Sequence, residues 1–415
     1  MKNSFILPHT WSLILLIIQL IFSPVLLAED GVTNTSITLG GIMDLEGRSS
    51  RLGQDMKTGL EAALNNQTVD GRKIRLLLEN DSYTPEHTLT AADSLLRKNI
   101  LLFIGNVGTP TTQALLPLLK AKQVPAFGFF TGSDILRGNQ DNIVNFRANY
   151  AQETKAVISE ALKHGLPANS LCAYMQSDVY GLGGIKGIVD ALQDVPDTQA
   201  LRDSLNKLLK QGEQNIQSDT TLPVGFYMRN TFKARDGYDA LKAWEKANNK
   251  SCKLVITIGT YEAIGHFIAY AHSKGETWLY SAVSFTGAEG LLASFKKFGI
   301  TDKVIMTQVV PEGSSNLPIV KNAREALGKN YSYVSQEGYI VGKLLLYGLK
   351  KLESTKQPLT RSNLMAVFKG QKFNLDGLSM DFTDDNQGSD LITMTHLEQG
   401  KWVSIDPATW DKWLQ

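Results

Sequence analysis

The sequence contains few residues of the kinds that carry catalytic or metal chemistry. It has 2 cysteines and 6 histidines among 415 residues. His266 and His272 are six positions apart, so they do not share one face of a helix. The H-E-x-x-H and G-x-S-x-G motifs and the Walker-type phosphate loop are all absent. We therefore predict that the protein is not an enzyme, with no catalytic residues, no metal site and no cofactor.

An excess of one charge is also missing. The formal net charge is +1, and Lys and Arg are spread along the chain without a basic stripe or an Arg-rich tail. A nucleic-acid partner is therefore not expected. Low-complexity segments and internal repeats of solenoid length are absent too. A globular chain of this length is too long for one typical core, which predicts two lobes.

Long hydrophobic runs are absent except at the N-terminus. There Lys2 precedes the apolar stretch Trp11–Leu27, which is interrupted by Gln19 and Pro24. This pattern is typical of a secretory signal peptide, residues 1–28, with cleavage near Ala28. The alternative is an uncleaved membrane anchor, but the stretch is shorter than the ~20 continuous apolar residues that a span needs. We expect a soluble protein exported to the periplasm.

Cys172 and Cys252 are the only cysteines, so no cysteine stands where a lipoprotein anchor would need one. Export makes a disulfide between them chemically possible. Each cysteine lies at the start of a predicted strand, Leu171–Met175 or Lys253–Ile258, and these strands would be neighbours in a doubly wound sheet. The alternative is that both are small buried hydrophobic residues.

Apolar runs and helical patterns alternate along the chain. Residues 36–150 predict strands at Ser36–Ile42, Lys73–Leu78, Leu101–Ile104 and Val124–Phe130 with helices between them. The alternation restarts with a helix over Glu153–His164 and continues to a strand at Val304–Val310. Such βαβ series form parallel sheets with helices on both faces. The predicted fold class is therefore α/β, with two doubly wound lobes.

Hydroxyl-bearing loops follow two successive strands of the first half. After Leu101–Ile104, Thr109 occupies the predicted N-cap position of a helix that begins near Pro110. The N–H groups of Thr111 and Thr112 would then be free to bind an anion or a ligand carbonyl. After Val124–Phe130 comes Thr131-Gly132-Ser133. Ligands in open α/β sheets bind beyond these strand ends, although Thr109 alone would be explained as a helix cap.

The order and content of these segments resemble the type I periplasmic solute-binding proteins of the branched-chain amino acid branch, which serve ABC importers. The resemblance covers residues 36–405. The stretches that carry it are Ile37–Leu45 with Gly53, Phe103–Thr112, Phe129–Leu136, Asn145–Glu153, Tyr180–Gly184, Gly259–Tyr261 and Tyr333–Tyr339.

The resemblance implies two lobes joined by three crossing strands, with the ligand held between them. Lobe one would comprise residues 31–149 and 308–375, and lobe two residues 150–307 and 376–415. Together with the loop analysis, it implies these ligand-binding residues: Thr109, Thr111, Thr112, Phe129, Thr131, Gly132, Asp178, Tyr180, Tyr261 and Ser284.

The sequence departs from the family pattern at one informative place. Amino-acid binders of the family have an acid after the lobe-two strand that ends here in Ala282-Val283-Ser284-Phe285, and this chain has none. Asp178 or Glu262 would have to replace it as the partner of an α-ammonium group.

We predict a monomeric solute-binding protein that captures a small polar ligand for an ABC permease in the inner membrane. A ligand sensor that feeds a membrane kinase or cyclase is the alternative. An exported enzyme on a similar scaffold is a third reading, and it would need a nucleophile or metal cluster that the sequence does not show.

Overall fold

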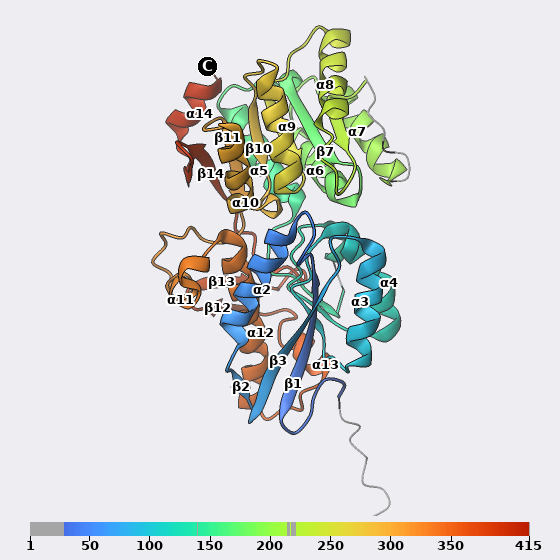
Figure 1. Cartoon of the computed structure of the whole chain (residues 1–415), viewed down its shortest axis with the longest axis vertical. Helices are drawn as coiled ribbons and strands as arrows, with labels where there is room; N and C mark the ends of the chain where they lie inside the picture. Colours follow the sequence, from blue (N-terminus) through green and yellow to red (C-terminus); the bar gives the residue numbers. More distant parts are fainter. Residues whose placement is uncertain (1–28, 139, 214–215, 217–220, 415) are drawn as a thin grey trace, which may run out of the picture.

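The computed structural model describes residues 29–414 apart from residues 139, 214–215 and 217–220. The predicted signal peptide, residues 1–28, lies outside the described residues. Two α/β lobes are stacked along the long axis of the molecule (Figure 1). Among the helices of the described residues, none combines the length and hydropathy that a membrane span requires.

Lobe one is built on a six-stranded sheet with the strand order β2-β3-β1-β4-β5-β6. Its strands are β1 (Ser36–Met43), β2 (Thr68–Val69), β3 (Arg72–Asn80), β4 (Phe103–Ile104), β5 (Ala126–Phe127) and β6 (Ile143–Val144). Neighbouring strands pair in parallel except β2 and β3. Its helices are α2 (Ser50–Leu64), α3 (Pro85–Arg97), α4 (Thr109–Lys122), α11 (Pro318–Leu327), α12 (Tyr333–Ser354) and α13 (Arg361–Ala366). Helices α3 and α4 pack together, whereas α2 packs with α11 and α12 (Figure 1).

Lobe two is built on a seven-stranded sheet with the order β15-β14-β11-β10-β9-β7-β8. Its strands are β7 (Leu171–Gln176), β8 (Val224–Tyr227), β9 (Leu254–Ile258), β10 (Leu279–Ala282), β11 (Val304–Gln308), β14 (Thr393–Glu398) and β15 (Lys401–Ser404). Strands β7 to β11 are parallel, and β14 and β15 extend the sheet in antiparallel fashion. Its helices are α5 (Tyr150–Lys163), α6 (Val179–Ala191), α7 (Gln199–Gln211), α8 (Ala234–Asn248), α9 (Tyr261–Ser273), α10 (Ala288–Phe298) and α14 (Pro407–Leu414).

The chain crosses between the lobes after β6, after β11 and before β14. The first and last crossings run side by side, since Asn145 bridges to Gln387 in parallel. A small hairpin, β12 (Lys372–Leu375) and β13 (Leu378–Asp381), precedes the last crossing and contacts α12. The predicted boundary after residue 375 falls within the turn of this hairpin, and the lobe boundaries stay a prediction.

The predicted alternation of strands and helices is confirmed along both halves, and the α/β class with it. Helix α2 buries Leu52, Met56, Leu60 and Ala63, the face that the spacing predicts. Two lobe-one strands are shorter than predicted, however. Strand β4 begins at Phe103, and β5 comprises only Ala126–Phe127, because Gly128 has a φ of +55° that ends the extended backbone.

Helices α2 and α12 meet backbone to backbone. A Cβ atom at Gly59 would lie 2.1 Å from the Ser335 carbonyl oxygen, and one at Gly338 would lie 2.6 Å from the Met56 carbonyl oxygen. Only glycine permits this separation. The close packing sets α12 firmly against lobe one, and this position matters for the site because α12 carries Glu337.

A disulfide joins Cys172 to Cys252, and the two cysteines are the only ones in the chain. Cys172 lies in β7, and Cys252 lies two residues before the neighbouring β9. The bond therefore ties two adjacent strands of lobe two across a sequence separation of 80 residues.

Reduction of this disulfide should destabilise lobe two. Closing a long loop restricts the unfolded chain, so we expect the free energy of unfolding to fall by about 2–4 kcal/mol. Urea unfolding with and without reductant measures the change. The control is the double variant Cys172→Ser/Cys252→Ser, which should be equally destabilised and should not respond to reductant. An unchanged midpoint for the reduced wild-type protein would contradict the prediction.

Candidate functional site

Three hydroxyl groups meet between the lobes, and we call them the hydroxyl cluster: Thr109, Thr131 and Tyr150. The Thr109 and Thr131 Oγ1 atoms are 2.7 Å apart, and the Tyr150 hydroxyl is 3.3 Å from each. All three residues are fully buried. Thr109 and Thr131 follow the carboxyl ends of β4 and β5, and Tyr150 opens α5. The structure thus brings both predicted hydroxyl loops together.

Helix α4 begins one residue earlier than predicted, and this changes the role of its threonines. Gly108, with a φ of +118°, is the N-cap residue, so Thr109 is the first helical residue and its side chain caps nothing. The Thr112 N–H donates to the Gly108 carbonyl and is not free, contrary to the prediction. The Thr111 hydroxyl donates to the Val107 carbonyl. Thr109 therefore directs its hydroxyl into the cluster.

Five aromatic rings surround the same place, and we call them the ring cluster: Tyr83, Phe130, Tyr150, Tyr180 and Phe285. Phe285 lies at the centre, with ring centroids 5.0 Å from Phe130 and from Tyr180. Tyr150 and Tyr83 are 6.2 and 6.5 Å away. Tyr83 and Phe130 belong to lobe one, whereas Tyr180 and Phe285 belong to lobe two. The cluster therefore closes the lobes on each other and lies within a single buried apolar core.

Phe129 lies elsewhere than predicted. Its side chain joins a separate core cluster of lobe one that includes Ile42, Leu115 and Leu136. Its neighbour Phe130 enters the ring cluster instead. The placement corrects the expectation that Phe129 faces the cleft.

A buried arginine, Arg147, occupies the first crossing and contacts residues of both lobes. Its Nη2 atom lies 3.3 Å from a Glu153 oxygen, and Nη1 lies 3.5 Å from a Glu337 oxygen. Nη2 also donates to the Ser284 hydroxyl. The guanidinium lies 4.9 Å from the ring centroid of Phe130. This arginine therefore links α5, α12, the loop after β10 and the ring cluster.

Glu153 holds the loop that carries Phe285. One carboxylate oxygen accepts from the Ser284 N–H at 2.8 Å and from the Thr307 hydroxyl. The other accepts from the Ser284 hydroxyl at 3.0 Å. Ser284, a predicted ligand-binding residue, is therefore engaged with the protein.

Two further predicted residues, Asp178 and Tyr180, lie in a polar network beside the ring cluster. The Asp178 carboxylate caps α6 by accepting from the Tyr180 N–H at 3.0 Å, and it accepts from Gln176 at 2.8 Å. Gln176 also donates to the Tyr83 hydroxyl of lobe one. Burial raises the pKa of Asp178 to about 6 against the lowering effects of Gln176 and of Arg229, which lies 3.5 Å away. The network joins the two lobes a second time.

The remaining predicted residues line the surroundings of these groups. Tyr261 donates from its hydroxyl to the Arg48 carbonyl of lobe one at 3.1 Å and packs against Gly290. Gly132 allows Tyr150 to approach, because an added Cβ would lie 2.7 Å from that ring. Glu262, the second alternative partner for an ammonium group, lies 3.7 Å from the Lys297 ammonium and 3.8 Å from the His266 ring. None of these three takes part in the hydroxyl cluster.

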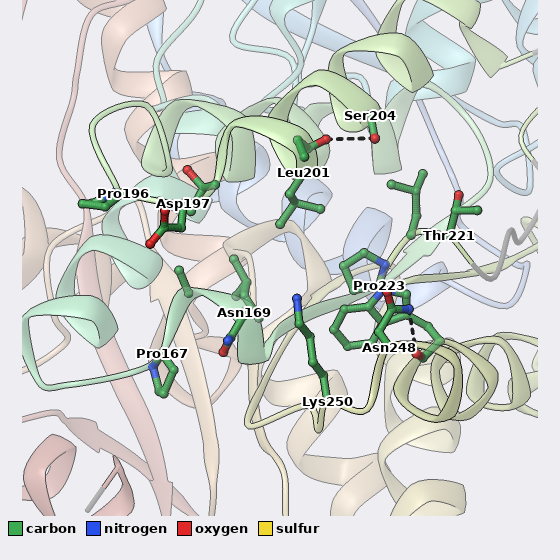
Figure 2. A pocket seen from close by; sticks show the side chains of 16 residues that line it. Pro167, Asn169, Pro196, Asp197, Leu201, Ser204, Thr221, Pro223, Asn248 and Lys250 are labelled. Atoms are coloured by element: carbon green, nitrogen blue, oxygen red, sulfur yellow. Dashed lines mark hydrogen bonds between the residues drawn. The ribbon is translucent and has the colours of Figure 1, made fainter.

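A hollow of about 540 Å³ lies at the amino ends of the strands of lobe two (Figure 2). Leu171 at the start of β7 and Pro223 just before β8 line it, together with Trp244 and Lys250. This is the amino end of the parallel strands, opposite to Asp178. Ligands in open α/β sheets bind at the carboxyl ends, so the geometry favours the cleft between the lobes.

Comparison with known proteins agrees with this architecture. Residues 36–198 match the sequence model of a family described as "Periplasmic binding protein". A possible leucine/isoleucine/valine-binding protein from Rhodopirellula baltica SH 1 is 28% identical, with a TM-score of 0.77 over 92% of this chain and 98% of its own. The fold of the chain is that of the type I periplasmic binding proteins. No curated protein matches the sequence significantly.

More distant structures share this fold. A branched-chain amino acid ABC transporter protein from Thermus thermophilus with bound valine is 13% identical, with a TM-score of 0.69 over 92% of this chain and 99% of its own. A solute-binding protein from R. palustris in complex with benzoate is 14% identical, with a TM-score of 0.66 over 89% and 95%.

Sequence reasoning missed several buried residues where the two lobes meet. Arg147 and Glu153 lie in a stretch that carries the family resemblance, but charged side chains are usually solvated. The run from Ile143 to Ala151 is mostly apolar and contains one charged residue, Arg147. This isolated charge was the available signal that Arg147 is buried. Phe285 and Tyr83 gave no signal of their own, since single aromatic residues are common in cores.

Glu337 carries the clearest electrostatic signature of the crossing. Burial raises its pKa to about 7, an effect that the Arg147 charge opposes and that Glu153 reinforces. Burial alone would lower the pKa of Arg147, but the Glu337 and Glu153 carboxylates raise it above its ordinary value. Arg147 therefore stays charged. The Glu337 carboxylate holds a proton more readily than a solvent-exposed carboxylate does.

Stability should consequently depend on pH through Glu337. The folded protein retains this proton up to about pH 7, whereas the unfolded chain releases it near 4.5. The folded state binds more protons in that window, so the contribution of Glu337 to the free energy of unfolding falls as pH rises through it. Glu337→Gln should gain stability relative to the wild-type protein as pH rises from 4.5 to above 7.

Urea unfolding at a series of pH values measures the difference between the two proteins. Glu325→Gln, the same change at an exposed position of α11, is the control and should show no such pH dependence. A difference between Glu337→Gln and wild type that is independent of pH would contradict the assignment.

Proposed function

We propose that this protein captures a small polar ligand, an amino acid, an amide or a carboxylate, between its lobes in the periplasm. It then delivers the ligand to an ABC permease in the inner membrane. The observation that carries the proposal is the meeting of the hydroxyl cluster and the ring cluster at facing strand ends of the two lobes. A ligand that touches both lobes favours the closed state over the open one.

The chemistry of the site suits a planar polar group attached to an apolar body. Thr109, Thr131 and Tyr150 offer hydroxyls that donate or accept hydrogen bonds. Thr109 stands at the N-terminus of α4, where the helix dipole favours negative charge. The buried Arg147 lies beside the rings and is paired with Glu153 and Glu337. The rings themselves would enclose the apolar part of the ligand.

The similar structures support a ligand of this size. One carries valine and another benzoate, and both ligands combine a carboxylate with an apolar body. They differ in the ammonium group, which valine has and benzoate lacks. In this chain the residues after β10, Val283-Ser284-Phe285, include no acid, and the buried Asp178 is already engaged with Gln176 and Tyr180.

Ligands without an α-ammonium group should therefore bind at least as tightly as branched-chain amino acids. Calorimetry with leucine, its deaminated keto acid and small amides compares them directly, and native mass spectrometry of the purified protein would detect a co-purified molecule. Small-angle scattering should show a smaller radius of gyration of the protein when a ligand that binds is added. Tight binding of leucine without binding of the keto acid would refute this selectivity. Failure to bind any small molecule would refute the proposed function itself.

Removal of one cleft hydroxyl should weaken binding without unfolding the protein. Thr131→Val keeps the shape of the side chain and removes a hydrogen bond to a charged group, which costs about 1.5–3 kcal/mol, or roughly tenfold to a hundredfold in affinity. Calorimetry measures the loss of affinity, with whichever of the compounds tested above binds the wild-type protein most tightly. Thr90→Val, the same change at an exposed position of α3, should leave affinity unchanged. Equal affinity of Thr131→Val and wild type would exclude this hydroxyl from the site.

A further inference from the structure

Phe285 is enclosed as a bound ligand would be. The side chain is fully buried, with Phe130 stacked on it and Tyr180 and Tyr150 meeting it edge to face. Both lobes contribute these neighbours. The Tyr150 ring that contacts Phe285 also carries the hydroxyl that lies 3.3 Å from Thr109 and from Thr131. The ring of Phe285 therefore occupies an aromatic enclosure that adjoins the polar cluster.

The backbone that carries this ring is fixed. Glu153 and Arg147 hold Ser284 on one side of it. On the other side Gly287, with a φ of +88°, lies so close to Leu52 of lobe one that an added Cβ would be 2.6 Å from it. Phe285 can leave the enclosure only by a side-chain rotation or by separation of the lobes.

We propose that Phe285 is an internal stand-in for the ligand, and that the ligand is a flat aromatic carboxylate whose ring replaces the Phe285 ring. This inference rests on the proposed function and adds a ligand class and a specificity-determining residue to it. In the closed arrangement of the lobes the Phe285 ring fills this enclosure. A ligand therefore competes with Phe285 for the same enclosure.

The geometry of the neighbours points to this ligand class. Phe130 stacks on Phe285 with an interplanar angle of 28°, which suits a flat ring better than a puckered one. The adjoining hydroxyls can donate to a negative group, and the N-terminus of α4 favours one. The nearby carboxylates of Glu153 and Asp178 are occupied by protein donors. A carboxylate joined directly to an aromatic ring meets both sets of groups at once.

Removal of the stand-in should strengthen binding of such a ligand. Competition by a closed, Phe285-filled state lowers apparent affinity by the fraction of protein that is free to bind. Phe285→Ala abolishes this state and leaves an enclosure lined by aromatic rings, of the kind that accepts small aromatic molecules. We expect benzoate to bind Phe285→Ala about tenfold or more tightly than wild type by calorimetry. Cyclohexanecarboxylate, with the same charge but a puckered ring, should gain less.

Two further variants complete the experiment. Phe298→Ala, at a half-exposed position on the same lobe, should bind benzoate as wild type does. Phe285→Leu is the smaller change, and it should show an intermediate gain even if the alanine variant folds poorly. Weaker or unchanged binding of benzoate to the folded Phe285 variants would overturn the inference, since Phe285 would then be a wall of the site. So would an equal gain for cyclohexanecarboxylate. In either case binding of another small ligand by the wild-type protein would leave the proposed function intact.

Discussion

The buried guanidinium of Arg147 is the interaction on which the rest of the site depends. A charge removed from water is very costly unless other charges and hydrogen bonds compensate it. Its compensation comes from Glu153 of α5, Glu337 of α12 and Ser284 of the loop after β10. These elements are far apart in sequence, and they can neutralise the charge of one arginine only when they converge on the first crossing. The requirement therefore fixes where the loop with Phe285 stands.

A second consequence concerns the closed arrangement of the lobes. The apolar core runs without interruption from the sheet of lobe one through the ring cluster into lobe two. Burial of apolar surface between the lobes favours closure by itself. A ligand must therefore contribute more than the contacts of Phe285 that it replaces, because it shifts the equilibrium only by its differential affinity for the two states.

The sequence was most informative where structure repeats and least informative where it is irregular. Alternating strands and helices predicted both lobes, and the hydroxyl loops of Thr109 and Thr131 met because successive parallel strands end at one edge of the sheet. The resemblance predicted Phe129 as a ligand-binding residue, whereas Phe130 enters the ring cluster in the structure, beyond the break in the strand at Gly128. Side chains beyond such a break no longer alternate, so their direction cannot be read from the pattern.

Long-range pairing was the other limit. Nothing near Arg147 in the sequence indicates that Glu337 faces it, since that contact depends on the close packing of α2 and α12 through Gly59 and Gly338. The resemblance indicated that no acid follows β10, but it did not indicate where Phe285 points. Only the structure shows that Phe285 turns inward to meet Phe130 of the other lobe. The loop after β10 thus supplies apolar surface to the contact between the lobes, and its position depends on the buried polar groups of Glu153 and Arg147 that hold Ser284.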